Sequence, residues 1–146
     1  MRTFIAFSVA GTTYAVSSQE VRHLEMVEEV TRVPNVAPYV DGVVFTRGRV
    51  VPVVSLRARF GFDRIPVDAQ TRLLVVQSGT RTVGLIVDAA REFLSIPAER
   101  IHPPHDALTS GASQYIDGVV SLEPRLIFLL NLDRLLPVSE PAVAGQ

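Results

Sequence analysis

The chain has 146 residues, a formal net charge of −1 and 47% apolar residues, which is typical of one compact folded unit and excludes a disordered chain. It has no cysteine, so disulfides and thiolate metal sites are excluded. Its 14 basic residues, all arginine, are balanced by 15 acidic residues, so the composition does not indicate a protein attracted to nucleic acid by charge.

Short valine-rich runs, separated by glycine, proline and polar pairs, predict an all-β fold with a few short helices. The expected strands are residues 4–9, 14–16, 30–33, 40–45, 50–56, 73–77, 82–87, 92–96, 115–122 and 126–130. Ser17 and Ser18 predict a capped short helix or turn through residues 19–24. Ser55 and Asn131 are expected to cap two further helices, at 56–60 and 132–136. Residues 62–71 predict a linker, and residues 97–111 a surface connection.

An internal repeat relates residues 39–60 to residues 115–136, without a gap, at an offset of 76 positions. Its clearest part is Tyr39-Val40-Asp41-Gly42-Val43-Val44 against Tyr115-Ile116-Asp117-Gly118-Val119-Val120, and Arg49 matches Arg125. The repeat predicts two packed lobes of about five strands, the number that closes a small barrel. The non-alternating run 50–54 predicts a core shared between the lobes.

We expect lobe one at roughly residues 4–61 and lobe two at roughly 72–137, within a single domain of residues 2–138 followed by a flexible tail, 139–146. The repeat also shows where the lobes differ. The turn between the paired strands is Arg47-Gly48 in the first copy and Glu123-Pro124 in the second. A position that varies on a duplicated frame is a natural place for function.

No group of side chains predicts catalysis, a metal or a cofactor. His102 and His105 are the closest histidine pair, but the prolines between them splay their side chains. There is no nucleophile elbow and no phosphate-binding glycine loop. No apolar run reaches the ~18 residues that span a membrane, so a cytoplasmic location is expected. Arg47 and Arg49 flank a glycine, which leaves open a small β-barrel module that binds nucleic acid or another ligand.

Residues 42–61, GVVFTRGRVVPVVSLRARFG, closely resemble the signature of the CheW family, the coupling proteins of bacterial chemosensory arrays. The likeness continues through residues 84–88, 96–104 and 115–118, and reaches back to 4–24 and 30–34. It implies two packed five-stranded SH3-like β-barrels that form a non-catalytic adaptor without a cofactor. Such an adaptor bridges the cytoplasmic tip of a methyl-accepting chemoreceptor and the regulatory domain of a CheA-type histidine kinase. It is recruited to membrane-associated arrays without entering the membrane.

Carried over by position, the resemblance implies receptor contact at Val21, Gly42 and Arg47. His23, Gly48 and Arg49 are expected to support this turn and interface. For two of these positions a structural role stands beside the functional one. Gly42 has a twin in Gly118, so both lobes can require it for their turn geometry, and Val21 can belong to the core.

The chain departs from the family pattern at three places. Phe45-Thr46 stands where the family usually has Asn-Leu, Ser55 where it has Asp, and His23 where a carboxylate is common. These departures leave open a divergent adaptor of the same family with an output other than chemotaxis.

Overall fold

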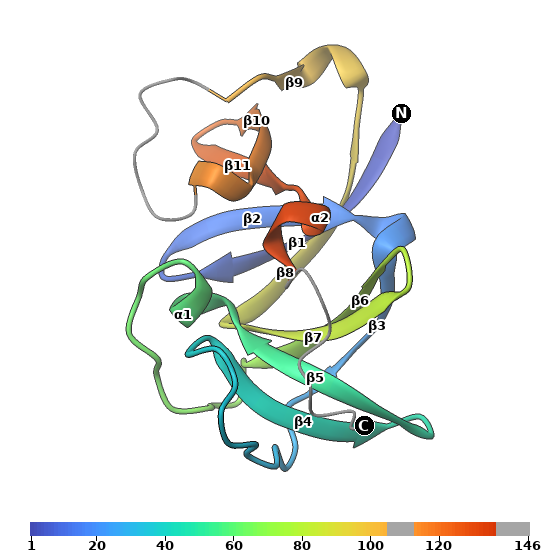
Figure 1. The fold of residues 1–146 in the computed structure, drawn as a ribbon. Helices are drawn as coiled ribbons and strands as arrows, with labels where there is room; N and C mark the ends of the chain where they lie inside the picture. The colour runs from blue at the N-terminus through green and yellow to red at the C-terminus, as the bar shows by residue number, and fades with distance from the viewer. Residues whose placement is uncertain (105–112, 137–146) are drawn as a thin grey trace.

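The computed structural model describes residues 1–104 and 113–136, which form two mixed β-sheets with short helices between them (Figure 1). Sheet A contains β1 (Arg2–Val9), β2 (Thr12–Ser17), β8 (Ala89–Ile96), β9 (Ile101–His102), β10 (Ile116–Leu122) and β11 (Arg125–Leu130). Sheet B contains β3 (Val21–Met26), β4 (Val40–Thr46), β5 (Arg49–Ser55), β6 (Arg72–Ser78) and β7 (Arg81–Val87). The helices are α1 (Leu56–Arg59) and α2 (Leu132–Leu135), with 3₁₀ turns η1 (Ser18–Glu20), η2 (Ala98–Arg100) and η3 (Ser113–Tyr115). The predicted mainly β fold is confirmed.

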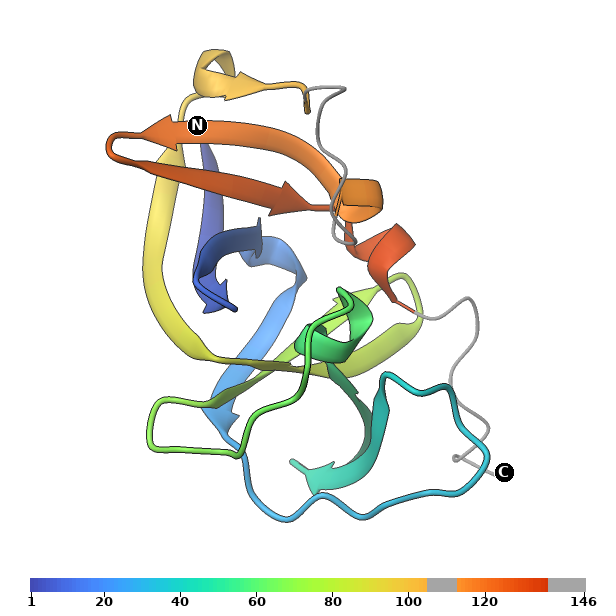
Figure 2. The same ribbon diagram turned by 90° about the vertical axis from the view of Figure 1, so that its left-hand side faces the viewer.

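Each sheet takes strands from both halves of the sequence, which corrects the predicted lobe boundaries of 4–61 and 72–137. The strand order is β8-β1-β2-β11-β10-β9 in sheet A and β3-β6-β7-β5-β4 in sheet B. The chain leaves sheet A after β2 and returns to it only with β8, as the crossing segments in Figure 2 show. Strands from the end of the chain therefore complete the sheet that the β1–β2 hairpin begins. In particular, β2 pairs in parallel with β11. The predicted tail, 139–146, lies outside the described residues.

The repeat itself is confirmed, as two copies of a hairpin followed by a helix. Both hairpins shift register at the same place, between Val40 and Gly42 in β4 and between Ile116 and Gly118 in β10. In both copies the residue that caps the helix donates its backbone N–H to the tyrosine that opens the repeat, at 2.9 Å in the first copy and 2.8 Å in the second. The Ser55 hydroxyl accepts from the Ala58 N–H, so serine caps α1 as expected.

The main core lies between the two sheets, as the unbroken apolar runs predict. It combines Phe7 and Tyr14 of sheet A with Leu74 and Leu85 of sheet B. The repeat partners Leu56 and Leu132 enter it from α1 and α2. Each sheet also curls around a smaller core of its own. Because the two sheets share their largest core, neither sheet is packed independently of the other.

Two local predictions need correction. The helix or turn predicted at 19–24 is wrong for residues 21–24: only η1 is helical, and β3 begins at Val21 and pairs with β6. Val21, His23 and Glu25 point inward in alternation with exposed neighbours, which is the pattern of a strand. The extended segment expected at 30–33 makes a single bridge, between Thr31 and Val43.

The Asp88 carboxylate ties the two sheets together, because it pairs with Arg57 of α1 and also accepts a hydrogen bond from the β1–β2 turn. Arg57 Nη2 lies 2.8 Å from Asp88 Oδ2, and the same oxygen accepts the Ala10 N–H from the β1–β2 turn at 2.8 Å. Both charged side chains are largely buried. One carboxylate therefore joins α1 to the end of β7 and to a turn of the opposite sheet.

Asp88→Ala is expected to lower the free energy of unfolding by roughly 2–3 kcal/mol, because it leaves a largely buried guanidinium and a backbone N–H without their acceptor. Asp133 pairs with Arg81 at 2.6 Å, but its side chain is 79% exposed. Asp133→Ala is the matched control and should cost less than about 1 kcal/mol. Urea unfolding of both variants measures the difference, and equal losses would contradict a linking role for Asp88.

Candidate partner-binding site

The turn between β4 and β5 is a two-residue hairpin turn with both central residues in the left-handed region. Arg47 has φ +51° and Gly48 has φ +78°. This is the geometry of a type I′ turn, which matches the twist of the flanking strands, and it explains why glycine follows Arg47. The Arg47 side chain is 67% exposed. The turn thus presents a cation at the tip of sheet B.

Two large apolar side chains flank this cation. Phe45 and Val50 are opposite each other in the β4–β5 register and are 75% and 57% exposed. At the equivalent pair in the second repeat, Ser121 lies opposite Leu126. An exposed phenylalanine beside an arginine therefore occurs on the first hairpin and not on its twin. Apolar surface next to a forked cation is typical of protein interfaces.

A carboxylate reaches this turn from the far edge of the same sheet. β3 and β4 are the two edge strands of sheet B. The Thr46 hydroxyl donates to Glu25 on β3, at 2.9 Å to Oε1 and 3.0 Å to Oε2. Arg47 Nε lies 3.7 Å from Glu25 Oε2, and His23 Nε2 lies 2.9 Å from the same oxygen. Glu25 therefore brings the tip of the hairpin together with β3.

The surroundings of His23 favour its neutral form. Burial lowers its pKa below the usual 6.5; the Glu25 carboxylate opposes this shift, and the Arg47 guanidinium adds to it. His23 is thus mainly uncharged at neutral pH. At that pH the full positive charge near the Glu25 carboxylate is therefore that of Arg47.

The structure gives the other predicted residues different surroundings. Val21 is half-buried, packs against the central core and pairs with Val76. Gly42 has φ +144° and lies directly beneath the Thr31 carbonyl. Arg49 is exposed and lies opposite Thr46. The structure thus brings His23, Arg47 and Gly48 together at the hairpin tip. Val21 instead packs against the core, and Gly42 lies against the backbone of Thr31.

Sequence reasoning missed Glu25 and Thr46. The signal available was the alternation of Val21, His23 and Glu25, which places all three on one face of a strand. Reading residues 19–24 as helix or turn concealed it. The meeting of Glu25 with Thr46 depends on closure of the sheet and has no local sequence signal.

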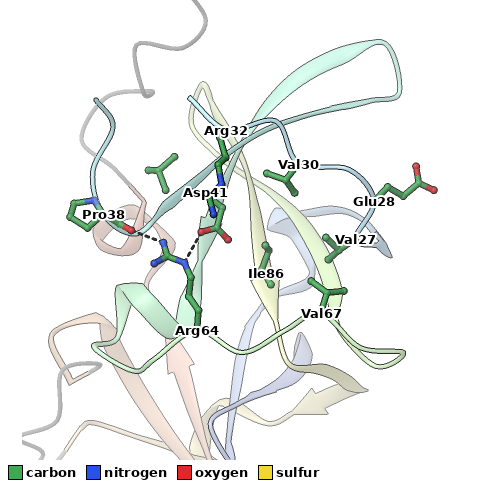
Figure 3. Close-up of a pocket in the computed structure, with 10 residues that line it drawn as sticks. Val27, Glu28, Val30, Arg32, Pro38, Asp41, Arg64, Val67 and Ile86 are labelled. Carbon is green, nitrogen blue, oxygen red and sulfur yellow. Dashed lines mark hydrogen bonds and ion pairs between the residues drawn. The ribbon is translucent and has the colours of Figure 1, made fainter. Parts of the chain in front are cut away.

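Two hollows lie near the site. A groove of about 260 Å³ runs between the end of β3 and β4, lined by Glu25, Met26, Glu28, Glu29, Thr31, Val44, Phe45, Thr46 and Leu73. A cavity of about 510 Å³ lies between the segment leading into β4 and the 62–71 segment (Figure 3). Across it, Arg64 Nε lies 2.8 Å from Asp41 Oδ1, and Arg64 Nη2 donates to the Pro38 carbonyl. These bonds attach the linker to the start of β4.

Within residues 1–104 and 113–136, no three His, Asp or Glu side chains gather where they could hold a metal ion. His102 lies in β9, and His105 lies outside the described residues. In the same part of the chain, no helix is long and apolar enough to cross a membrane.

Comparisons with known proteins agree with this architecture. The family model described as the CheW-like domain matches residues 3–140 of this chain. The chain is 30% identical to the chemotaxis protein CheW of Klebsiella aerogenes over 98% of its length and 86% of the relative's. It is 31% identical to CheW of Bacillus subtilis over 97% of its length and 92% of the relative's.

The crystal structure of the scaffolding protein TtCheW from Thermoanaerobacter tengcongensis has the same fold. Its TM-score is 0.85 with 25% sequence identity, and the match covers 95% of this chain and 96% of that one. Sequence and structure agree over nearly the whole length, so the chain belongs to the CheW-like family.

Proposed function

We propose that this CheW-like chain is an adaptor that joins the cytoplasmic tip of a chemoreceptor to the regulatory domain of a CheA-type histidine kinase. Its relatives are named chemotaxis proteins, and its structural neighbour is named a scaffolding protein, which supports an adaptor. In this proposal the chain catalyses no reaction and works in the cytoplasm, recruited to membrane-associated receptor arrays.

The receptor tip binds at the β4–β5 turn. The observation that carries this assignment is the asymmetry of the two hairpins: exposed Arg47 lies beside the exposed pair Phe45 and Val50 on one hairpin alone. A receptor tip is a helical hairpin with an apolar ridge, and the exposed apolar pair Phe45 and Val50 beside Arg47 can pack against such a ridge. Arg47 then donates to carbonyls or carboxylates of the partner.

The other predicted site residues support this surface. Gly48 sets the turn, and Arg49 adds a second cation beside it. Val21 anchors β3 to the core, and Gly42 fixes the path of β4 against the 27–39 segment. In this proposal they shape the receptor surface more than they touch the receptor.

We expect the purified chain to bind a soluble receptor-tip fragment and the kinase regulatory domain separately at micromolar concentration, and to form a ternary complex with both. Calorimetry and size-exclusion chromatography measure these interactions. Binding to neither fragment would refute the adaptor. An oligonucleotide titration at low salt separates the alternative of a nucleic-acid-binding barrel, for which salt-dependent binding is required.

A further inference from the structure

The cavity between the 27–39 segment and the 62–71 segment opens onto the small core of sheet B (Figure 3). Val27, Val30 and Ile86 line the cavity, and the same three side chains pack, partly buried, against that core. Val67 adds a fourth branched side chain, which is 56% exposed. A volume of about 510 Å³ is within the range of small-molecule sites. One wall of the cavity is therefore aliphatic and incompletely covered.

Charged side chains lie on the other side of the cavity. Figure 3 shows Asp41 and Arg64 to one side and Val27 and Val67 to the other. Asp41 Oδ1 accepts a hydrogen bond from Arg64 Nε at 2.8 Å, and within residues 1–104 and 113–136 its Oδ2 accepts none. Arg32 also lines the cavity, and its side chain has no hydrogen bond or ion pair in that part of the chain.

We propose that this cavity binds an aliphatic α-amino acid as its zwitterion. The carboxylate of the ligand pairs with the Arg32 guanidinium, its ammonium group donates to Asp41 Oδ2, and its branched side chain packs against the aliphatic wall. The inference goes beyond the adaptor function and does not depend on it. Arg47, Phe45 and Val50, which form the proposed receptor surface, are not among the residues that line the cavity.

The balance of charge around the cavity favours a zwitterion over a simple anion or cation. The charged lining residues are two arginines, Arg32 and Arg64, and two carboxylates, Asp41 and Glu28. A simple anion would be repelled by Asp41, and a simple cation by the arginines, whereas a zwitterion pairs with both signs. Because Arg64 already holds Asp41, the free carboxylate oxygen is fixed in place before a ligand arrives.

The internal repeat supplies a comparison within the same molecule. Asp117, the twin of Asp41, lines a smaller hollow of about 260 Å³ in sheet A. Glu20 and Asp133 line that hollow as well, and Arg2 is its one arginine. With three carboxylates and one guanidinium, the second hollow does not offer the balanced pair that a zwitterion needs. The proposed site is therefore expected on the first copy alone.

A series of ligands tests the chemical class. L-leucine is the probe, and we expect saturable binding with a dissociation constant of about 1 mM or tighter. Isocaproate lacks the ammonium group and isoamylamine lacks the carboxylate, so each should bind about tenfold more weakly. L-alanine keeps both charges and lacks the branched chain, and should also bind at least about tenfold more weakly. Calorimetry measures the affinities, and NMR spectra of methyl-labelled protein locate the ligand beside Val27, Val30, Val67 and Ile86.

Three variants test the residues. Arg32→Gln removes an exposed cation and should leave the fold intact while it weakens L-leucine binding about tenfold. Asp41→Asn should cause a similar loss. Asp117→Asn is the matched control, because it makes the same change at the twin position, and it should bind L-leucine within about twofold of wild type. Urea unfolding shows whether each variant remains folded, and if Asp41→Asn does not, Arg32→Gln and the ligand series decide.

Several results would overturn the assignment. These are no saturable binding of L-leucine at about 20 mM, isocaproate or isoamylamine binding as tightly as L-leucine, and wild-type affinity in Arg32→Gln. Methyl shifts confined to residues outside the cavity would overturn it too. Neither a receptor nor a kinase fragment enters these measurements, so their outcome is separate from that of the adaptor test.

Discussion

Gly42→Ala is expected to lower the free energy of unfolding by roughly 3 kcal/mol or more, and Gly118→Ala by about 1 kcal/mol. The two glycines occupy the same position in the two repeats, so the sequence alone predicts equal effects of the two substitutions on stability. The structure separates them. A Cβ at Gly42 would lie 2.0 Å from the Thr31 carbonyl oxygen, and the residue has φ +144°.

The cost at Gly42 has two sources. A side chain is strained in that backbone conformation, and the Thr31 carbonyl must move, which disrupts the paired hydrogen bonds of 2.8 and 2.9 Å between Thr31 and Val43. A Cβ at Gly118 would meet the Ile101 Cγ2 at 2.9 Å, and a side chain can turn away. Urea unfolding of both variants tests the difference. A loss at Gly42 no greater than at Gly118 would show that the close approach of Thr31 is dispensable.

Arg47→Glu is expected to weaken binding of the receptor-tip fragment by tenfold or more while binding of the kinase regulatory domain stays within about twofold. The substitution removes the cation of the proposed surface and places a second carboxylate near Glu25 Oε2, from which Arg47 Nε is 3.7 Å away. Repulsion between the two carboxylates then drives the turn away from β3.

Arg91→Glu is the matched control, because Arg91 is exposed on β8 of the opposite sheet and the change in net charge is the same. Calorimetric titration of both variants with both fragments makes the comparison. If Arg47→Glu reduces binding to the kinase and the receptor alike, Arg47 has a structural role instead.

The sequence predicts the local units of this fold well and their assembly poorly. The hairpin and helix of residues 39–60 follow from valine-rich runs, a turn and a capping serine, all within a few residues of one another. The pairing between β2 and β11 does not follow from such local signals, because its partners Thr13 and Ile127 are 114 positions apart. A repeat shows that two units are alike and carries no information on which strands complete each sheet.

The candidate site divides in the same way. Arg47 and Gly48 could be singled out because they interrupt the repeat. The role of Glu25 could not, since it depends on β3 and β4 meeting at the open side of sheet B, and these strands are opposite edges of the sheet. Gly42 shows the converse case: the sequence offered receptor contact or a turn geometry shared with Gly118, and the structure adds a contact with Thr31 that Gly118 does not share.

The crossing of the chain between the sheets also sets the order in which they can be built on the ribosome. All strands of sheet B lie between Val21 and Val87, so this sheet, with its Arg47 turn, is complete in sequence while residues beyond it are still being added. Sheet A begins with β1 and cannot close until β11 has been synthesised. The early hairpin β1–β2 must therefore wait for strands from the end of the chain, at the entropic cost of closing a long loop.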